Sequence, residues 1–239
     1  MPLTLPLPGE RVRGLTLLGA WSSPFGVPEP PARRWLNAAV AFVGLVVTLP
    51  LILVIAALVR VSSPGPILYT QPRVGLNRRR HRRAAFNGRR QDDCGGRPFA
   101  IYKFRTMRPA PRNGDLQVWA GADEARITPI GRWLRRTHLD ELPQLFNVLL
   151  GDMNVVGPRP EQPSIFGRLK RDLTAYGRRQ LVRPGITGWA QVNLPYDQTL
   201  DDVRRKLTFD LEYLRRQSAA EDLRIMWRTL PVMFQRRGR

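Results

Sequence analysis

The chain has little cysteine, little histidine and few acidic residues. Its 239 residues include one cysteine, Cys94, and two histidines. One cysteine excludes an intramolecular disulfide, and neither histidine has the spacing of a zinc site. Asp and Glu number 19 against 39 Lys and Arg, which gives a formal net charge of +20. This excess favours a polyanionic partner: anionic lipid, nucleic acid or a phosphate-bearing substrate.

The first 32 residues lack a periodic apolar pattern and are rich in Pro and Gly, so we predict a flexible N-terminal tail over residues 1–32. They do not form a signal peptide, because the apolar block begins after them and no small-residue cleavage site follows it. We also expect no four-helix membrane bundle before Trp35, since that stretch is too short and too polar.

An uncharged apolar run extends from Trp35 to Val59, and about 20 such residues suffice to cross a bilayer. Pro50 removes a backbone hydrogen bond inside this run and predicts a kink or break. Basic residues flank both ends, so the run has no clear positive-inside preference. A re-entrant membrane helix over residues 33–66, turning back at Pro50, accounts for both observations. A single kinked span is the alternative.

Two adjacent carboxylates, Asp140 and Glu141, precede an apolar pattern of helical spacing over residues 142–149, with Gly151 as a plausible stop. Pro143 fits such a helix only in its first turn. The pattern therefore predicts Asp140 at or near the N-cap and Glu141 just inside the helix. The pair is either a cap that complements the helix dipole or a catalytic pair.

Several cations lie in segments whose composition is unusual for a core. Arg159 stands between two prolines, which favour a stiff, extended backbone suited to a bidentate grip on phosphate, although an ordinary turn would look the same. Residues 99–107 read as a strand that places Lys103 and Arg105 on one face. Arg183 opens the segment 183–193, whose two glycines permit close approach of a ligand or form a plain turn and strand.

Three blocks resemble one family in order and in content: KFRTM (103–107), DELPQLFNVLLGDMNVVGPRPE (140–161) and RPGITGWAQVN (183–193). They look like the signatures of the bacterial sugar transferases, which are monotopic phosphoglycosyl transferases. The resemblance extends from about residue 35 to about residue 234. It implies a small, mainly helical α+β catalytic domain over residues 67–239, with a re-entrant membrane helix and interfacial amphipathic helices, on the cytoplasmic face of the bacterial inner membrane.

The resemblance also implies the reaction. A UDP-sugar gives its sugar-1-phosphate to undecaprenyl phosphate, UMP is released, and assembly of an exopolysaccharide, O-antigen or other glycan begins. Asp140 corresponds to the nucleophile that carries the phosphosugar covalently, and Glu141 to a proton handler or orienting group. Mg2+ is expected beside the pair, with Asp140 as a ligand. The expected phosphate-binding residues are Lys103, Arg105, Arg159 and Arg183.

Other parts of the chain depart from the family or leave alternatives open. His138 stands where relatives carry a small residue, and either tunes the acidic pair or lies at the surface. The residues after Asn193 also differ, which leaves the sugar open. The Arg-rich stretch 77–96 looks like an insertion, either a solvated loop or a contact for anionic headgroups. Nucleic-acid binding is not expected, because no aromatic interleaving accompanies it. Residues 201–234 have the helical spacing of either an interfacial or a core helix.

Two functions of other classes compete with transfer. One is a Mg2+-dependent hydrolase of nucleotide sugars or lipid diphosphates, and the other is a non-catalytic, basic, membrane-anchored binding protein. A requirement for polyprenyl phosphate in net turnover distinguishes the three.

Overall fold

The structure of the protein is a computed structural model. It describes residues 11–12, 15–16, 29–77, 96–108, 126–173, 175–195 and 199–234. Of the predicted tail it describes two short antiparallel strands, β1 (Arg11–Val12) and β2 (Leu15–Thr16), and the residues from 29 onward. Nearly all of the Arg-rich stretch 77–96 lies outside the described residues.

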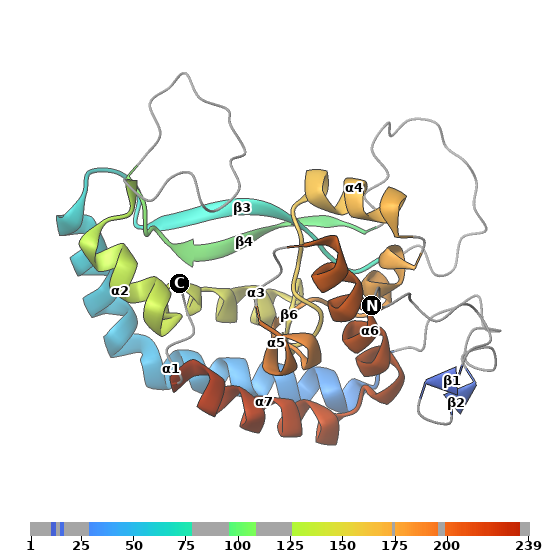
Figure 1. Ribbon diagram of the computed structural model, residues 1–239. Helices are drawn as coiled ribbons and strands as arrows, with labels where there is room; N and C mark the ends of the chain where they lie inside the picture. The colour runs from blue at the N-terminus through green and yellow to red at the C-terminus, as the bar shows by residue number, and fades with distance from the viewer. Residues whose placement is uncertain are drawn as a thin grey trace.

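Helix α1 (Pro31–Ser62) is one continuous helix of 32 residues. Pro50 lies inside it and has no N–H for the carbonyl of Val46, and the Thr48 hydroxyl bonds back to the Gly44 carbonyl at 2.6 Å. Both features bend helices. In Figure 1 the first half of α1 follows the lower edge of the molecule and the second half turns upward. Of the two predicted outcomes at Pro50, the structure therefore has a bend and not a break.

A long hairpin lies on the other side of the domain (Figure 1). Strand β3 (Leu68–Val74) pairs antiparallel with β4 (Pro98–Phe104), and Tyr69 lies directly opposite Lys103. The strand predicted over residues 99–107 ends at Phe104, so Arg105 lies just beyond it. Ile101 packs against α3 from the inner face of this hairpin, as part of one apolar cluster.

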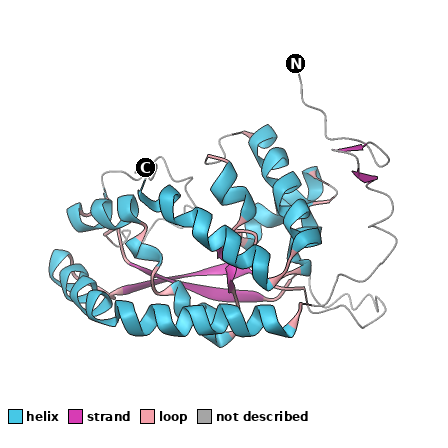
Figure 2. Cartoon of the chain, turned by 90° about the horizontal axis from the view of Figure 1, so that it is seen from below, coloured by secondary structure: helices cyan, strands magenta, loops and turns pink. Residues whose placement is uncertain are grey.

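Short elements complete the domain around α1 and the hairpin. They are α2 (Pro129–Thr137), the 3-10 turn η4 (Leu139–Glu141), α3 (Gln144–Leu150), β5 (Asn154–Val156), α4 (Pro163–Asp172), the 3-10 turn η5 (Tyr176–Leu181), β6 (Gly185–Thr187) and α5 (Trp189–Asn193). Strands β5 and β6 pair in parallel. The segment after Arg183, for which a turn and strand were one prediction, thus forms a strand followed by a short helix. Figure 2 shows helices surrounding this small amount of sheet, which confirms a mainly helical fold.

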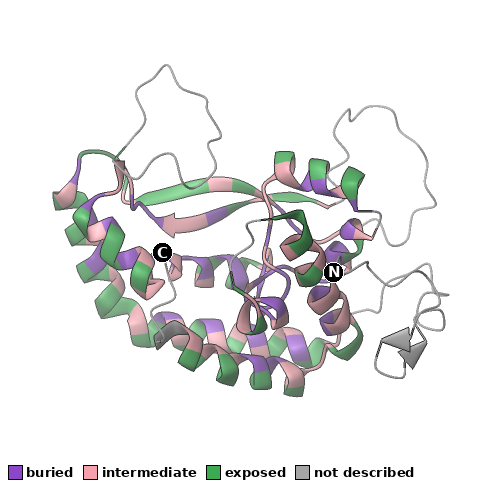
Figure 3. Cartoon of the chain, in the orientation of Figure 1, coloured by how far each residue is buried: buried purple, intermediate pink, exposed green. Residues whose placement is uncertain are grey.

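The C-terminal stretch forms two helices, α6 (Leu200–Arg216) and α7 (Ala219–Phe234). Helix α7 runs beside the first half of α1 (Figure 1). It buries Ile225 completely but leaves Trp227 76% exposed, together with Leu223 and Leu230. Figure 3 shows exposed residues along both α1 and α7. Helix α7 therefore has one core face and one exposed apolar face; its core face is confirmed, and an interfacial position stays a prediction.

Both ends of α1 are bonded to the same domain. At its N-terminal end the buried Arg33 guanidinium donates to the Val156 carbonyl and to Asp222, each at 2.9 Å. Asn37 accepts a bond from the Val155 N–H at 2.8 Å. At the C-terminal end Arg105 donates to the carbonyl and hydroxyl of Ser63 at 2.6 and 3.0 Å. The helix is thus tied to the core at both ends, while apolar residues in its middle, such as Val47 at 71%, stay exposed.

Candidate active site

The acidic pair lies in a 3-10 turn and not at the start of an α-helix. His138, which ends α2, has the left-handed backbone angle φ 57°, and this angle turns the chain sharply into η4. Helix α3 begins only at Gln144, with Pro143 as its N-cap residue. The prediction that Asp140 caps this helix is therefore wrong, because the pair belongs to η4 and Leu142 and Pro143 separate it from α3. The predicted stop is confirmed: Gly151 ends α3 with φ 86°.

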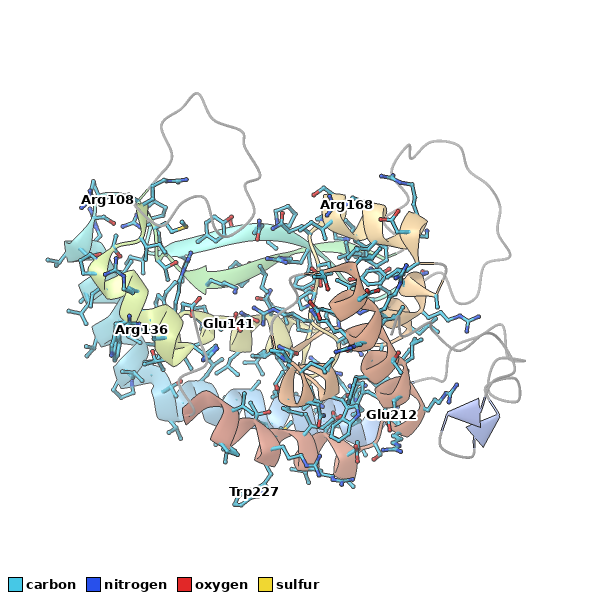
Figure 4. The ribbon with its side chains drawn as sticks, viewed as in Figure 1. Arg108, Arg136, Glu141, Arg168, Glu212 and Trp227 are labelled. Atoms are coloured by element: carbon cyan, nitrogen blue, oxygen red, sulfur yellow. The ribbon has the colours of Figure 1, made fainter. Side chains whose placement is uncertain are left out.

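Glu141 is held between two cations from distant parts of the chain. Its Oε1 accepts bonds from Lys103 Nζ at 2.6 Å and from Arg159 Nη2 at 2.8 Å. Burial alone would raise the pKa of Glu141, but the charges and hydrogen bonds of Arg159 and Lys103 outweigh it and hold that pKa far below its usual value. Glu141 is therefore ionised at neutral pH. Figure 4 shows it beneath the β3–β4 hairpin.

Asp140 has a different environment, although it is the next residue. Its side chain is buried, and the described residues give it neither a hydrogen bond nor an ion pair. Burial and the neighbouring Glu141 raise the pKa of Asp140, while the charges of Lys103, Arg135 and His138 oppose that rise. Two adjacent carboxylates with pKa values moved in opposite directions are a common arrangement in active sites.

His138 is half-buried, and its Nδ1 has no hydrogen-bond partner among the described residues. Its charge acts on Asp140, so the interpretation that it tunes the acidic pair has electrostatic support. A non-glycine residue in the left-handed region carries about 1–2 kcal/mol of strain. Such strain is often found beside functional groups.

A second group of charged residues surrounds Glu161 and extends the site beyond the acidic pair. Glu161 lies 3.7 Å from Arg179 and 3.8 Å from Lys206, and Arg179 donates to Asp210 at 2.7 Å. A small cavity lies beside this group, and its walls include Gly75, Arg159, Glu161, Arg179 and Gln180. Lys206 and Asp210, both on α6, thus serve as partners of Glu161 and Arg179.

The structure separates the four predicted phosphate-binding residues. Lys103 and Arg159 meet at Glu141. Arg105 is buried and bonded to Ser63 at the end of α1. Arg183 donates to the Gly151 carbonyl at 2.9 Å and pairs with Glu29. Phosphate binding by Arg105 and Arg183 therefore stays a prediction, without support from their present partners.

Sequence reasoning missed two cations that lie near the pair. Arg135 is held by a bond from its Nε to the Thr106 hydroxyl at 2.9 Å, and its charge acts on Asp140. Arg73 donates to the Pro160 carbonyl at 3.0 Å and lies within electrostatic range of Glu141 and Glu161. Arg135 lies five residues before Asp140, so its proximity in sequence could have identified it. Arg73 lies far from the pair in sequence, and no local pattern marks it.

A metal at this site would depend on the substrate for most of its ligands. Among the described residues no three or more His, Cys, Asp and Glu side chains gather into a metal-binding group. Mg2+ commonly binds one or two protein carboxylates and completes its shell with substrate phosphates and water. The unpaired carboxylate of Asp140 fits this kind of shared site.

An acidic pair between arginines and lysines suits chemistry on phosphates, because fixed cations stabilise the charge of a phosphoryl group. The family model described as "Bacterial sugar transferase" matches residues 29–236. The chain therefore belongs to the bacterial sugar transferase family.

Three curated relatives illustrate the similarity. A UDP-glucose:undecaprenyl-phosphate glucose-1-phosphate transferase of Xanthomonas campestris is 41% identical, over 82% of this chain and 37% of the relative. A UDP-N-acetylgalactosamine-undecaprenyl-phosphate N-acetylgalactosaminephosphotransferase of Aeromonas hydrophila is 36% identical, over 84% of this chain and 43% of the relative. A UDP-glucose:undecaprenyl-phosphate glucose-1-phosphate transferase of Caulobacter vibrioides is 35% identical, over 84% of this chain and 69% of the relative. The chain spans less than half the length of the first two.

Proposed function

We propose that this chain transfers a sugar-1-phosphate from a UDP-sugar to undecaprenyl phosphate and releases UMP. The observation that carries the proposal is the contrast between the adjacent carboxylates: Asp140 is buried without a partner, and Glu141 is neutralised by two cations. The relatives named above act on undecaprenyl phosphate and supply the substrate class. Initiation of an exopolysaccharide or another bacterial glycan follows from that class.

Asp140 is the nucleophile in this mechanism. One of its carboxylate oxygens attacks the phosphorus that bears the sugar, and the bond from that phosphorus to the UMP oxygen breaks as the new bond forms. UMP leaves with the electron pair. A phosphate oxygen of undecaprenyl phosphate then attacks the same phosphorus, which frees the Asp140 carboxylate and forms the undecaprenyl diphosphate sugar. Burial favours the attack, because a carboxylate with few water contacts is more reactive.

Glu141 orients the cations in this mechanism. It is ionised at neutral pH, since its pKa is far below the usual range, so it is poorly suited to carry a proton. Its two hydrogen bonds instead hold Lys103 and Arg159 where the phosphate charge develops. The charge of Arg135, like that of Lys103, acts on Asp140. Cations fixed in advance in this way stabilise a phosphoryl-transfer transition state without further reorganisation.

Asp140 and the phosphate oxygens of the donor would hold Mg2+. When bound, the ion would neutralise the diphosphate and make the phosphorus more electrophilic. Asp140 could both attack and bind the ion, because attack on phosphorus uses one carboxylate oxygen and the other would be available to Mg2+.

We also propose that α1 is re-entrant and that the domain lies on the cytoplasmic face. The described part of the chain contains one helix long and apolar enough to cross a membrane, namely α1, and this suggests membrane association. The hydrogen bonds of Arg33 and of Ser63 attach its two ends to one domain. A spanning helix would place these ends on opposite sides of the bilayer. A helix that bends near Pro50 dips its exposed middle into the lipid and returns.

Helix α7 would lie in the interface beside α1. Its exposed face combines Leu223, Trp227 and Leu230 with the exposed Arg224 and Arg228. Such a face inserts its apolar side chains at headgroup level and offers its arginines to anionic lipid. Figure 4 shows Trp227 pointing away from the domain.

Release of UMP tests the proposed reaction. The full chain in detergent micelles is given a panel of UDP-sugars with and without undecaprenyl phosphate. Transfer requires both substrates for repeated turnover. UMP release at the same rate without the lipid would indicate a hydrolase, and no UMP release with any sugar would leave a binding protein.

Labelling of cysteines tests the topology. In a Cys94→Ser background, Ser22→Cys and Arg204→Cys place one thiol before α1 and one on α6. A re-entrant helix predicts that a membrane-impermeant reagent reaches both thiols only after the cytoplasmic face is exposed. Labelling of Ser22→Cys alone in intact spheroplasts would show a span. Pro50→Leu should straighten the helix and shift Ser22→Cys toward outside labelling.

A further inference from the structure

The inner face of the β3–β4 hairpin is covered except at one aromatic residue. Side chains alternate along a strand, so Tyr69, Gln71 and Arg73 share the face that carries Ile101 and Lys103 on the neighbouring strand. Ile101 is 3% exposed in the core, and Gln71 and Arg73 are half-buried. Tyr69 is 48% exposed. The inner face is therefore open at Tyr69.

This opening lies beside the acidic pair. Tyr69 is the direct cross-strand partner of Lys103, and such partners have Cβ atoms about 4.5–5.5 Å apart. Lys103 in turn contacts Glu141 at 2.6 Å. Four residues along the strand from Tyr69, on the same face, Arg73 lies in the electrostatic range of both Tyr69 and Glu141. The exposed ring of Tyr69 therefore lies next to two cations, Lys103 and Arg73.

The direction of displacement decides which part of the donor reaches this ring. In-line transfer places the leaving group opposite the nucleophile. The charges of Lys103, Arg135 and His138 all act on Asp140; Arg135 and His138 come from α2 and its end, whereas Lys103 comes from the hairpin, directly opposite Tyr69. With the sugar-bearing phosphorus at Asp140, the leaving nucleotide extends toward the hairpin. The planar base offers a π face to an exposed aromatic ring.

We propose that Tyr69 stacks on the base of the nucleotide donor and is thus a further substrate-binding residue. This inference rests on the proposed function, because it takes Asp140 as nucleophile and a nucleotide sugar as donor. It also gives a role to an aromatic side chain that the hairpin leaves uncovered on its inner face.

Binding of UMP, measured by calorimetry with the full chain in detergent micelles, tests the proposal without turnover. Tyr69→Leu should weaken UMP binding about 5- to 100-fold, the usual loss when one base loses an aromatic partner. Tyr69→Phe keeps the ring and should stay within about twofold of the wild type. Leu68→Ala is the matched control, since Leu68 is 42% exposed on the opposite face of the same strand, and it should bind UMP like the wild type.

Three results would count against the proposal, and they differ in what they overturn. Equal UMP binding by Tyr69→Leu and the wild type overturns the stacking. Weaker binding of the UDP-sugar with unchanged UMP binding assigns the ring to the sugar and overturns contact with the base. A wild-type chain that binds neither compound overturns the proposed function itself. If circular dichroism shows Tyr69→Leu to be unfolded, Tyr69→Thr, which favours a strand, has the same expected loss.

Discussion

Asp140→Asn should abolish transfer and at the same time stabilise the protein. The buried carboxylate has no hydrogen bond or ion pair among the described residues, and its like-charged neighbour is Glu141. A neutral amide of the same size removes both the burial cost of the charge and the repulsion. Loss of a covalent nucleophile should lower turnover by several orders of magnitude.

The expected gain in stability is about 0.5–2 kcal/mol, the common size for replacing a strained functional group. In a domain of this size each kcal/mol shifts the Tm by about 2–4 °C. The gain should depend on pH with a definite sign. Burial raises the pKa of Asp140 in the folded protein above its ordinary value of 3.8. Wild-type stability therefore falls as the pH rises from 3.8 to this raised pKa. The advantage of Asp140→Asn is therefore full at neutral pH and vanishes toward pH 3.8.

Thermal melting and UMP release on the same purified samples measure both effects. Glu141→Gln is the matched control, because it is the adjacent isosteric change with the opposite expected sign. It leaves Lys103 and Arg159 without their anion and should lower the free energy of unfolding by about 1–3 kcal/mol. A Tm for Asp140→Asn below that of the wild type would make Asp140 a structural residue. Turnover of Asp140→Asn within about tenfold of the wild type would refute the assignment of Asp140 as the nucleophile.

Three further changes test other contacts. Arg159→Lys should lose most activity with little change in Tm, because a point charge cannot replace a planar guanidinium; near-normal turnover would make Arg159 an ordinary turn residue. Arg33→Met should lower the free energy of unfolding by about 3–5 kcal/mol in a denaturant titration, since Asp222 would lose its buried partner; an unchanged midpoint contradicts this. His138→Val should be about 1–2 kcal/mol less stable than His138→Gly, because the left-handed backbone admits glycine freely; equal melting would show no strain there.

Local sequence was sufficient for features that depend on a few neighbouring residues. Gly151 ends α3 because glycine adopts φ 86° without a steric cost. The uncharged run around Pro50 predicted a long apolar helix with a kink or break at the proline, and composition was sufficient for the helix itself; the missing N–H could not by itself decide between a kink and a break. The acidic pair could also be recognised, since its motif is contiguous. Its exact local structure could not, because helical periodicity from Leu142 onward says nothing about the left-handed turn at His138.

Tertiary structure alone decided which side chains meet. Lys103 and Arg159 are 38 and 18 residues from Glu141, yet both bond to it, whereas Arg105 and Arg183, predicted on the same grounds, have other partners. The opposite pKa shifts of Asp140 and Glu141 likewise depend on burial and on those distant cations. Local propensity acts over a few residues, but convergence of side chains depends on how the hairpin, α1 and the short elements pack. Packing is a property of the whole chain, so it cannot be read from any one segment.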